Sequence, residues 1–231
     1  MPVRARGAPN GYPASIMREL TLPEGAASAC LAGRGDTVVV LGHGAGGSRR
    51  TPMLVALAEA LAASGRAALL YNFPYAEKGA RRPDPPAVLE SAALAAARLA
   101  LAESGARRLV LGGRSMGGRI ASQIVARGAV VAGLVFLGYP LHPPGRPEQL
   151  RDAHLGRIEA PMLFVQGTRD AFAREDLLLR TTGALGTRAE LVRIAEADHS
   201  FGVLKRSGRR PADVLREVEG AIFSWLGRQG L

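Results

Sequence analysis

Short apolar runs alternate with amphipathic stretches along this chain, a pattern typical of a parallel β-sheet covered by helices. The segment 37–41 (TVVVL) has four consecutive β-branched residues followed by leucine, as expected of a strand buried on both faces. Strands are also predicted at residues 27–32, 67–71, 109–112, 134–138, 162–166 and 190–194. Helices are predicted between them, at residues 52–63, 86–105, 119–127 and 175–185, and from 211 onward. Alternation of this kind predicts an α/β fold with a mainly parallel sheet and helices on both faces.

Chain length and the N-terminal composition predict the domain organisation. A length of 231 residues suits one α/β domain with a substantial core and is short for two. Residues 1–15 are predicted to form a flexible N-terminal arm, and residues 16–231 a single domain. No apolar run approaches the ~20 residues of a membrane span, and the N-terminus lacks the apolar core of a secretion signal. We therefore expect a cytoplasmic protein with no membrane partner.

Cysteine content limits the possible metal and disulfide chemistry. Cys30 is the only cysteine, which excludes an intrachain disulfide and a multi-cysteine metal site. Its apolar surroundings in the predicted strand at 27–32 predict a small buried side chain. We expect neither a metal nor a cofactor.

The net charge of +10 raises the question of a nucleic-acid partner. Lys78 and Lys205 are the only lysines, so arginine supplies nearly all of the 30 basic residues. The arginine pairs are scattered along the chain, and no aromatic residues are interleaved with them. We interpret the charge as a solvated basic surface and expect no nucleic-acid partner.

The segment 113–117 (GRSMG) fits the nucleophile elbow, G-x-S-x-G. It follows a predicted strand and precedes a predicted helix, which is the context that the motif requires. The tight turn leaves no room for side chains at Gly113 and Gly117. Such a turn lifts the Oγ atom of Ser115 clear of the sheet, so Ser115 is the candidate nucleophile.

Two further residues follow predicted strands at the same edge of the sheet, where α/β folds bind their ligands. Asp170 follows the strand at 162–166, and His199 follows the strand at 190–194. Serine, acid and histidine thus occur in the chain order of α/β-hydrolases. His199 would take the proton of Ser115, and Asp170 would orient the imidazole and stabilise the imidazolium. Asp198 is the alternative acid, although its adjacency to His199 directs its side chain away from the ring.

The glycine-rich segment 42–47 (GHGAGG) directly follows the strand at 37–41 and allows two interpretations. Small residues there let backbone N–H groups approach a developing alkoxide, so Ala45 and Met116 are predicted to form an oxyanion hole. The segment also fits the dinucleotide-binding pattern G-x-G-x-x-G. That pattern requires an acidic residue at the end of the next strand, where this chain has 71–74 (YNFP). The oxyanion interpretation is therefore preferred.

Together these motifs resemble the α/β-hydrolase superfamily, and within it the small dienelactone-hydrolase-like group related to testis-expressed and chromatin-complex proteins. The supporting segments are 41–47 (LGHGAGG), 71–75 (YNFPY), 112–117 (GGRSMG), 138–145 (GYPLHPPG) and 197–201 (ADHSF). The resemblance implies Ser115, Asp170 and His199 as a catalytic triad. Dienelactone hydrolases proper use a cysteine nucleophile, so their activity is not implied here.

Cap domains of this superfamily usually follow the strand that corresponds to 134–138. Here only residues 139–161 separate that strand from the next, which leaves space for a proline-rich loop and one short helix. We therefore expect no cap domain and an open, shallow site. His142 and His154 lie in this loop and are expected to be exposed and without chemistry.

Several residues near the predicted site have open roles. Arg114 and Gly44 are candidate substrate-binding residues, although Arg114 also suits a structural contact. Arg49 and Arg50 have the same two interpretations. His43 is expected to support the glycine-rich loop rather than to act as a base.

The sequence therefore predicts a serine hydrolase that cleaves a small-molecule carboxylic ester or thioester through an acyl-enzyme, without a cofactor. The alternative is a catalytically idle α/β-hydrolase scaffold that serves as an interaction protein. An intact set of Ser115, Asp170 and His199 favours the enzyme. The acyl group, the leaving group and the oligomeric state are not specified by the sequence.

Overall fold

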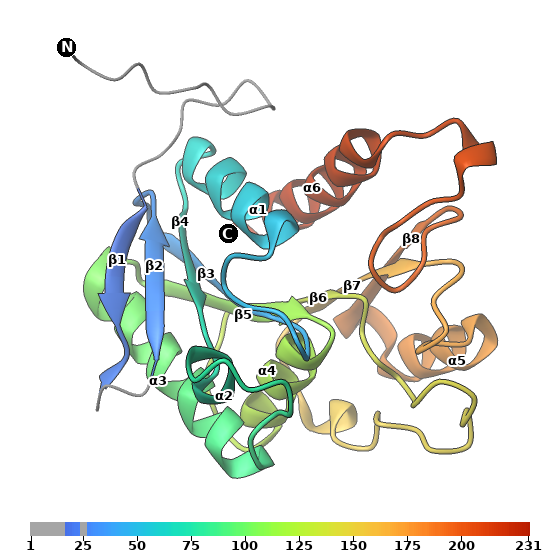
Figure 1. Ribbon diagram of the computed structural model, residues 1–231, viewed down its shortest axis with the longest axis horizontal. Coiled ribbons are helices and arrows are strands. Elements are labelled where there is room, and N and C mark those ends of the chain that lie inside the picture. The colour runs from blue at the N-terminus through green and yellow to red at the C-terminus, as the bar shows by residue number, and fades with distance from the viewer. Residues whose placement is uncertain (1–16, 24–26) are drawn as a thin grey trace.

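A computed structural model describes residues 17–23 and 27–231 of the chain (Figure 1). The predicted N-terminal arm at residues 1–15 lies outside the described residues. Within the described part of the chain, no helix is both long and apolar enough to cross a membrane.

The described residues build an eight-stranded sheet in the order β1-β2-β4-β3-β5-β6-β7-β8. Strands β3 to β8 pair in parallel, whereas β2 is antiparallel to both of its neighbours, β1 and β4. The mainly parallel α/β fold predicted from the sequence is thereby confirmed. The strands are β1 (Arg18–Thr21), β2 (Ser28–Ala32), β3 (Thr37–Gly42), β4 (Ala67–Tyr71), β5 (Arg108–Arg114), β6 (Gly133–Leu137), β7 (Met162–Gly167) and β8 (Ala189–Ile194).

Helices cover both faces of this sheet and create two apolar cores. Helices α1 and α6 lie on one face of the sheet, and helices α3, α4 and α5 lie on the other (Figure 1), where their side chains contribute to the two cores. Alternate residues of β3 contribute to the two cores. Val38 and Val40 pack in the core with α3, α4 and α5, and Val39 and Leu41 pack in the core with α1 and α6. The helices are α1 (Pro52–Ala63), α2 (Pro74–Glu77), α3 (Pro86–Ser104), α4 (Met116–Ala126), α5 (Glu175–Leu185) and α6 (Pro211–Arg228).

Several elements differ from the sequence-based expectation, among them α2, which is not predicted, and β5, which spans Arg108–Arg114 where 109–112 is predicted. Strand β1 was not predicted, because its residues RELT are mostly exposed at the margin of the sheet and lack an apolar pattern. Helix α4 begins at Met116, three residues before the predicted start, because it continues directly from the strained residue Ser115.

The segment between β6 and β7 contains a single 3-10 turn, Leu155–Arg157, and no cap domain is inserted there. The carboxyl ends of β5, β7 and β8 therefore lie together without a covering domain. These are the strand ends that carry the three candidate catalytic residues.

Candidate active site

The turn between β5 and α4 holds Ser115 in a strained backbone conformation, with φ of 50° and ψ of −112°. Neighbouring backbone passes so close that a Cβ atom at Gly113 or Gly117 would lie 2.2 Å from the carbonyl oxygen of Gly42. Glycine is therefore obligatory at both positions of the motif. The N–H of Ser115 donates to the carbonyl of Leu137 at 2.9 Å, which fixes the turn against β6.

The structure brings Ser115, His199 and Asp170 into one hydrogen-bonded chain. The Nε2 atom of His199 lies 2.8 Å from Oγ of Ser115, and its Nδ1 atom lies 2.7 Å from Oδ2 of Asp170. The side chain of Asp170 is fully buried. With Asp170 ionised, Nδ1–H of His199 donates to the carboxylate, and Nε2 accepts the proton of Ser115.

Two residues that the sequence did not single out complete the surroundings of Asp170 and His199. Gln166 donates from Nε2 to Oδ2 of Asp170 at 2.5 Å, and its Oε1 accepts from the N–H of Tyr139 at 2.8 Å. The N–H of Phe172 donates to Oδ1 of Asp170 at 2.7 Å, and its ring stacks on the imidazole at 4.1 Å. The one available signal is Gln166 itself, the single polar side chain of an otherwise apolar strand.

The alternative acid, Asp198, is engaged in the loop that follows His199. Its Oδ1 atom accepts from the N–H groups of Ser200 at 2.8 Å and Gly202 at 2.9 Å. The carboxylate thus stabilises the turn, and the imidazole contacts Asp170 instead.

The two predicted oxyanion donors have backbone N–H groups without an acceptor among the described residues. Met116 is the first residue of α4, where helical N–H groups lack an intrahelical partner. Ala45 is exposed in the loop after β3, and a turn from Gly47 N–H to Gly44 carbonyl, at 3.0 Å, shapes that loop. A Cβ atom at Gly44 would lie 3.5 Å from Cβ of Ser115, so this loop adjoins the candidate nucleophile.

A model of the alpha/beta hydrolase domain family matches residues 35–227. The chain belongs to this family. Its backbone is similar to that of a dienelactone hydrolase from Anabaena variabilis, with a TM-score of 0.72 and 22% identity over 93% of this chain and 97% of that one. An alpha-beta serine hydrolase homologue from Coxiella burnetii gives a TM-score of 0.70 at 18% identity, over 90% and 96% of the two chains. A serine hydrolase without lid from Xanthomonas campestris gives 0.67 at 20% identity, over 93% and 96%.

The family resemblance inferred from the sequence motifs is confirmed by these matches. At such identities the structural likeness concerns the fold. Among the described residues of this α/β hydrolase, no group of three or more His, Cys, Asp and Glu side chains is arranged to hold a metal ion.

His43 supports the glycine-rich loop of this α/β hydrolase from a fully buried position. Its Nδ1–H donates to the carbonyl of Gly44 at 2.8 Å, and its Nε2 accepts from the N–H of Phe73 at 3.1 Å. Burial lowers the pKa of His43, which favours the neutral ring that this arrangement requires. Both nitrogens are occupied, so His43 connects the loop to the segment after β4.

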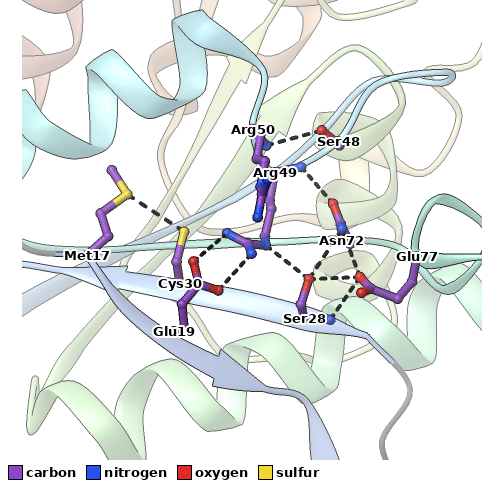
Figure 2. Close-up of polar contacts among 9 residues, drawn as sticks. All are labelled: Met17, Glu19, Ser28, Cys30, Ser48, Arg49, Arg50, Asn72 and Glu77. Atoms are coloured by element: carbon purple, nitrogen blue, oxygen red, sulfur yellow. Dashed lines mark hydrogen bonds and ion pairs between the residues drawn. The ribbon is translucent and has the colours of Figure 1, made fainter. Parts of the chain in front are cut away.

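The buried side chain of Arg49 anchors the far end of the same loop through a polar network (Figure 2). Its guanidinium donates to both carboxylate oxygens of Glu19 on β1, at 3.2 and 2.7 Å, and to Oγ of Ser28 on β2, at 3.0 Å. Its backbone N–H donates to Oδ1 of Asn72 at 2.7 Å, and Asn72 in turn donates to Glu77 at 2.8 Å. Of the two interpretations of Arg49, the structural one is therefore correct.

Neighbours of this network differ in their exposure. Arg50 is exposed, and its backbone N–H donates to Oγ of Ser48 at 3.2 Å. Cys30 is buried as predicted, with its Sγ atom 3.8 Å from Sδ of Met17 (Figure 2). Burial raises the pKa of the Cys30 thiol, which keeps it protonated and unreactive.

Arg114 lies between the glycine-rich loop after β3 and the loop that follows His199. Its Nη2 donates to Oγ of Ser200 at 2.7 Å, and its Nη1 lies 3.5 Å from the position that a Cβ atom of Gly44 would occupy. No carboxylate of the described residues lies within ion-pair distance of the guanidinium. Burial lowers the pKa of Arg114, and the negative charges of Asp198 and Asp170 oppose that effect.

The expected exposure of His142 and His154 was wrong, because the loop at 139–161 folds back onto α4 and α5. His142 is buried, and its ring accepts from the N–H of Arg174 at 2.9 Å. His154 is half-buried, with Nε2 at 2.7 Å from Oγ of Ser122 on α4. Both histidines therefore have structural contacts.

His154 predicts a loss of stability in acid. Burial, followed by the positive charges of Arg119 and Arg157, lowers the pKa of His154 to about 4 from an ordinary value of 6.5. Between pH 6.5 and pH 4, His154 is therefore protonated in the unfolded chain but neutral in the folded chain. The contribution of His154 to the free energy of unfolding is complete above pH 6.5 and is lost as the pH falls toward 4. In His154→Gln, the decrease in Tm between pH 7 and pH 5 is expected to be smaller by roughly 4 °C. Thermal unfolding of the wild-type and His154→Gln proteins between pH 7 and pH 5 checks this prediction. An equal decrease in Tm in the two proteins would contradict it.

Proposed function

We propose that this α/β hydrolase is a serine hydrolase that cleaves carboxylic esters or thioesters, with Ser115, His199 and Asp170 as its triad. The observation that supports this best is the unbroken chain of contacts from Ser115 Oγ through the imidazole to the buried carboxylate, at 2.8 and 2.7 Å. A serine that merely began helix α4 would need neither a strained φ nor a histidine on its hydroxyl.

In the first half of the reaction, Oγ of Ser115 attacks the carbonyl carbon while Nε2 of His199 takes the hydroxyl proton. Asp170 holds the imidazole by Nδ1–H and stabilises its positive charge, and Gln166 and Phe172 N–H hold the carboxylate in place. The N–H groups of Met116 and Ala45 donate to the developing oxyanion.

The tetrahedral intermediate then loses its leaving group. His199 gives its proton to the leaving oxygen or sulfur, which departs as an alcohol or thiol and leaves an ester on Ser115. Water then attacks the acyl-enzyme, with His199 as base, and releases the carboxylic acid and the free serine. No cofactor takes part, and the expected cytoplasmic location stays a prediction.

Arg114 and Gly44 are proposed to contact the substrate beside the scissile bond. Gly44 presents backbone next to Ser115, and the closest neighbours of an added Cβ would be at 3.5 Å, so the loop admits a substrate atom there. The guanidinium of Arg114 donates to Ser200, and its remaining N–H groups are available to a polar or anionic substrate group.

Intact-mass spectrometry after treatment with a fluorophosphonate tests the proposed nucleophile. Because His199 activates the hydroxyl of Ser115, wild-type protein is expected to gain one adduct, and Ser115→Ala none. Ser64→Ala, which changes a serine at the end of α1, serves as the matched control and should gain the adduct. Absence of an adduct on folded wild-type protein would favour the idle scaffold.

A further inference from the structure

A groove opens on the α1 and α6 face of the molecule, beside the loop that follows His199. Its volume is about 720 Å³, within the range of roughly 300–1,000 Å³ that is typical of small-molecule sites. The apolar side chains of Met53 and Ala56 from α1, Phe201 and Val203 from the loop, and Leu215 from α6 line it. A groove with these walls suits an apolar group.

This groove adjoins the candidate active site through Ser200. Ser200, the residue after His199, lines the groove and accepts the hydrogen bond from Arg114, the residue before the nucleophile. Pro52, which also lines it, begins the helix that follows the oxyanion loop. The groove thus lies between the loop that follows His199 and the start of the helix that follows the loop of Ala45.

The chemistry of the triad indicates which part of a substrate lies there. The leaving oxygen or sulfur must come within hydrogen-bond reach of Nε2 of His199, because that nitrogen delivers its proton. The alcohol or thiol part of the substrate, which is bonded to this leaving atom, therefore extends along the side of the site that is formed by the loop that follows His199. That loop, at Ser200 and Phe201, forms one wall of the groove.

The charges of the groove add a second constraint. The charged residues that line it, Lys205 and Arg209, are both cations. Arg209 pairs with Glu217 and donates to the carbonyl of Ala195, whereas Lys205 forms no ion pair with any described residue. An exposed, unpaired ammonium on an apolar wall complements an anionic group at the far end of an apolar ligand.

We infer that the groove binds the leaving group of the substrate, an apolar alcohol or thiol that carries an acidic group able to pair with Lys205. This inference rests on the proposed function and specifies the substrate class of that same site. The balanced reaction is cleavage of the acyl–oxygen or acyl–sulfur bond by Ser115, protonation of the departing atom by His199, and hydrolysis of the acyl-enzyme by water.

Two matched ester series test the assignment. Butyrate esters of ethanol, butanol and hexanol vary the leaving group, and ethyl esters of acetic, butyric and hexanoic acid vary the acyl group. Each fully buried methylene favours binding about fourfold. Because the groove is open, we expect kcat/KM to rise at least about tenfold from ethyl to hexyl butyrate, and less than about threefold along the acyl series.

Variants locate the effect in the groove. Ala56→Trp fills it and is expected to reduce the hexyl-to-ethyl ratio to about twofold or less, whereas Ala87→Trp, on an exposed position of α3 at the other face, retains the ratio. The butyrate ester of 6-hydroxyhexanoate probes the charge. Relative to hexyl butyrate, its kcat/KM should fall about two- to fivefold in Lys205→Gln and recover in Lys205→Arg.

The outcomes separate this inference from the proposed function. A flat alcohol series, or a rise confined to the acyl series, would overturn the assignment of the groove to the leaving group, provided that hydrolysis still depends on Ser115. Hydrolysis that continues unchanged in Ser115→Ala would overturn the proposed function itself. If Lys205→Gln left the kcat/KM of the 6-hydroxyhexanoate ester relative to hexyl butyrate unchanged, the inference that the leaving group carries an acidic group would be overturned.

Discussion

Replacement of Ser115 by alanine is expected to lower kcat for ester hydrolysis by roughly 10³- to 10⁶-fold. The variant loses the attacking oxygen, while the backbone of the elbow stays as it is. Alanine has the same Cβ atom at φ of 50°, and the N–H at this position still donates to Leu137, so the fold should be retained. Steady-state kinetics on a short ester, with circular dichroism on the same samples, measures both quantities.

The residual rate of this variant decides the interpretation. The proposed oxyanion donor Met116 N–H remains in place in this variant, so a small residual rate of hydrolysis by water is expected. Ser64→Ala should keep wild-type kcat. A Ser115→Ala protein with more than about one per cent of wild-type kcat would contradict the assignment of the nucleophile.

Asp170→Asn is expected to lower kcat by roughly 10³- to 10⁴-fold. The amide oxygen can still accept from the N–H of Phe172 in the place of Oδ1, which leaves the amide NH₂ in the place of Oδ2, facing Nδ1 of His199. That contact favours the tautomer with the proton on Nε2, which cannot accept the proton of Ser115. The substitution also removes the charge that stabilises the imidazolium. Kinetics across pH 6–9 measures the loss.

Asp198→Asn is the matched control for this prediction, because it makes the same chemical change one residue from His199. Its amide oxygen can still accept from the N–H groups of Ser200 and Gly202. We expect less than a tenfold change in kcat. If Asp198→Asn were the more damaging of the two, Asp198 would be the acid and the arrangement around Asp170 would be structural.

Regular elements with strong local signals could be predicted closely from the sequence. The strand Ala67–Tyr71 and the helix Glu175–Leu185 have the predicted bounds, because an apolar run and an amphipathic period each specify one local structure. Strand β1 could not be found in this way. It exists because Arg18–Thr21 pairs with β2, and backbone pairing across the chain leaves little local pattern in an exposed strand.

The candidate site shows the same division between local and distant signals. Ser115, Asp170 and His199 could be proposed together because each follows a predicted strand, and parallel strands end at one edge of a sheet. The support of Asp170 by Gln166 and the anchoring of Arg49 by Glu19 could not be proposed. Each of these contacts depends on which side chains the folded sheet brings face to face.

The network around Arg49 affects whether this protein loses its activity before or together with its fold. Glu19 lies on β1, an edge strand of the sheet, and its side chain is 64% exposed, so this edge should open by local fluctuation at a lower free energy than the central strands. Opening there removes the contacts of Glu19 with the guanidinium of Arg49 and so weakens the anchor of the segment carrying Ala45. Activity would then be lost when this edge of the sheet opens, under conditions in which the central strands are still folded.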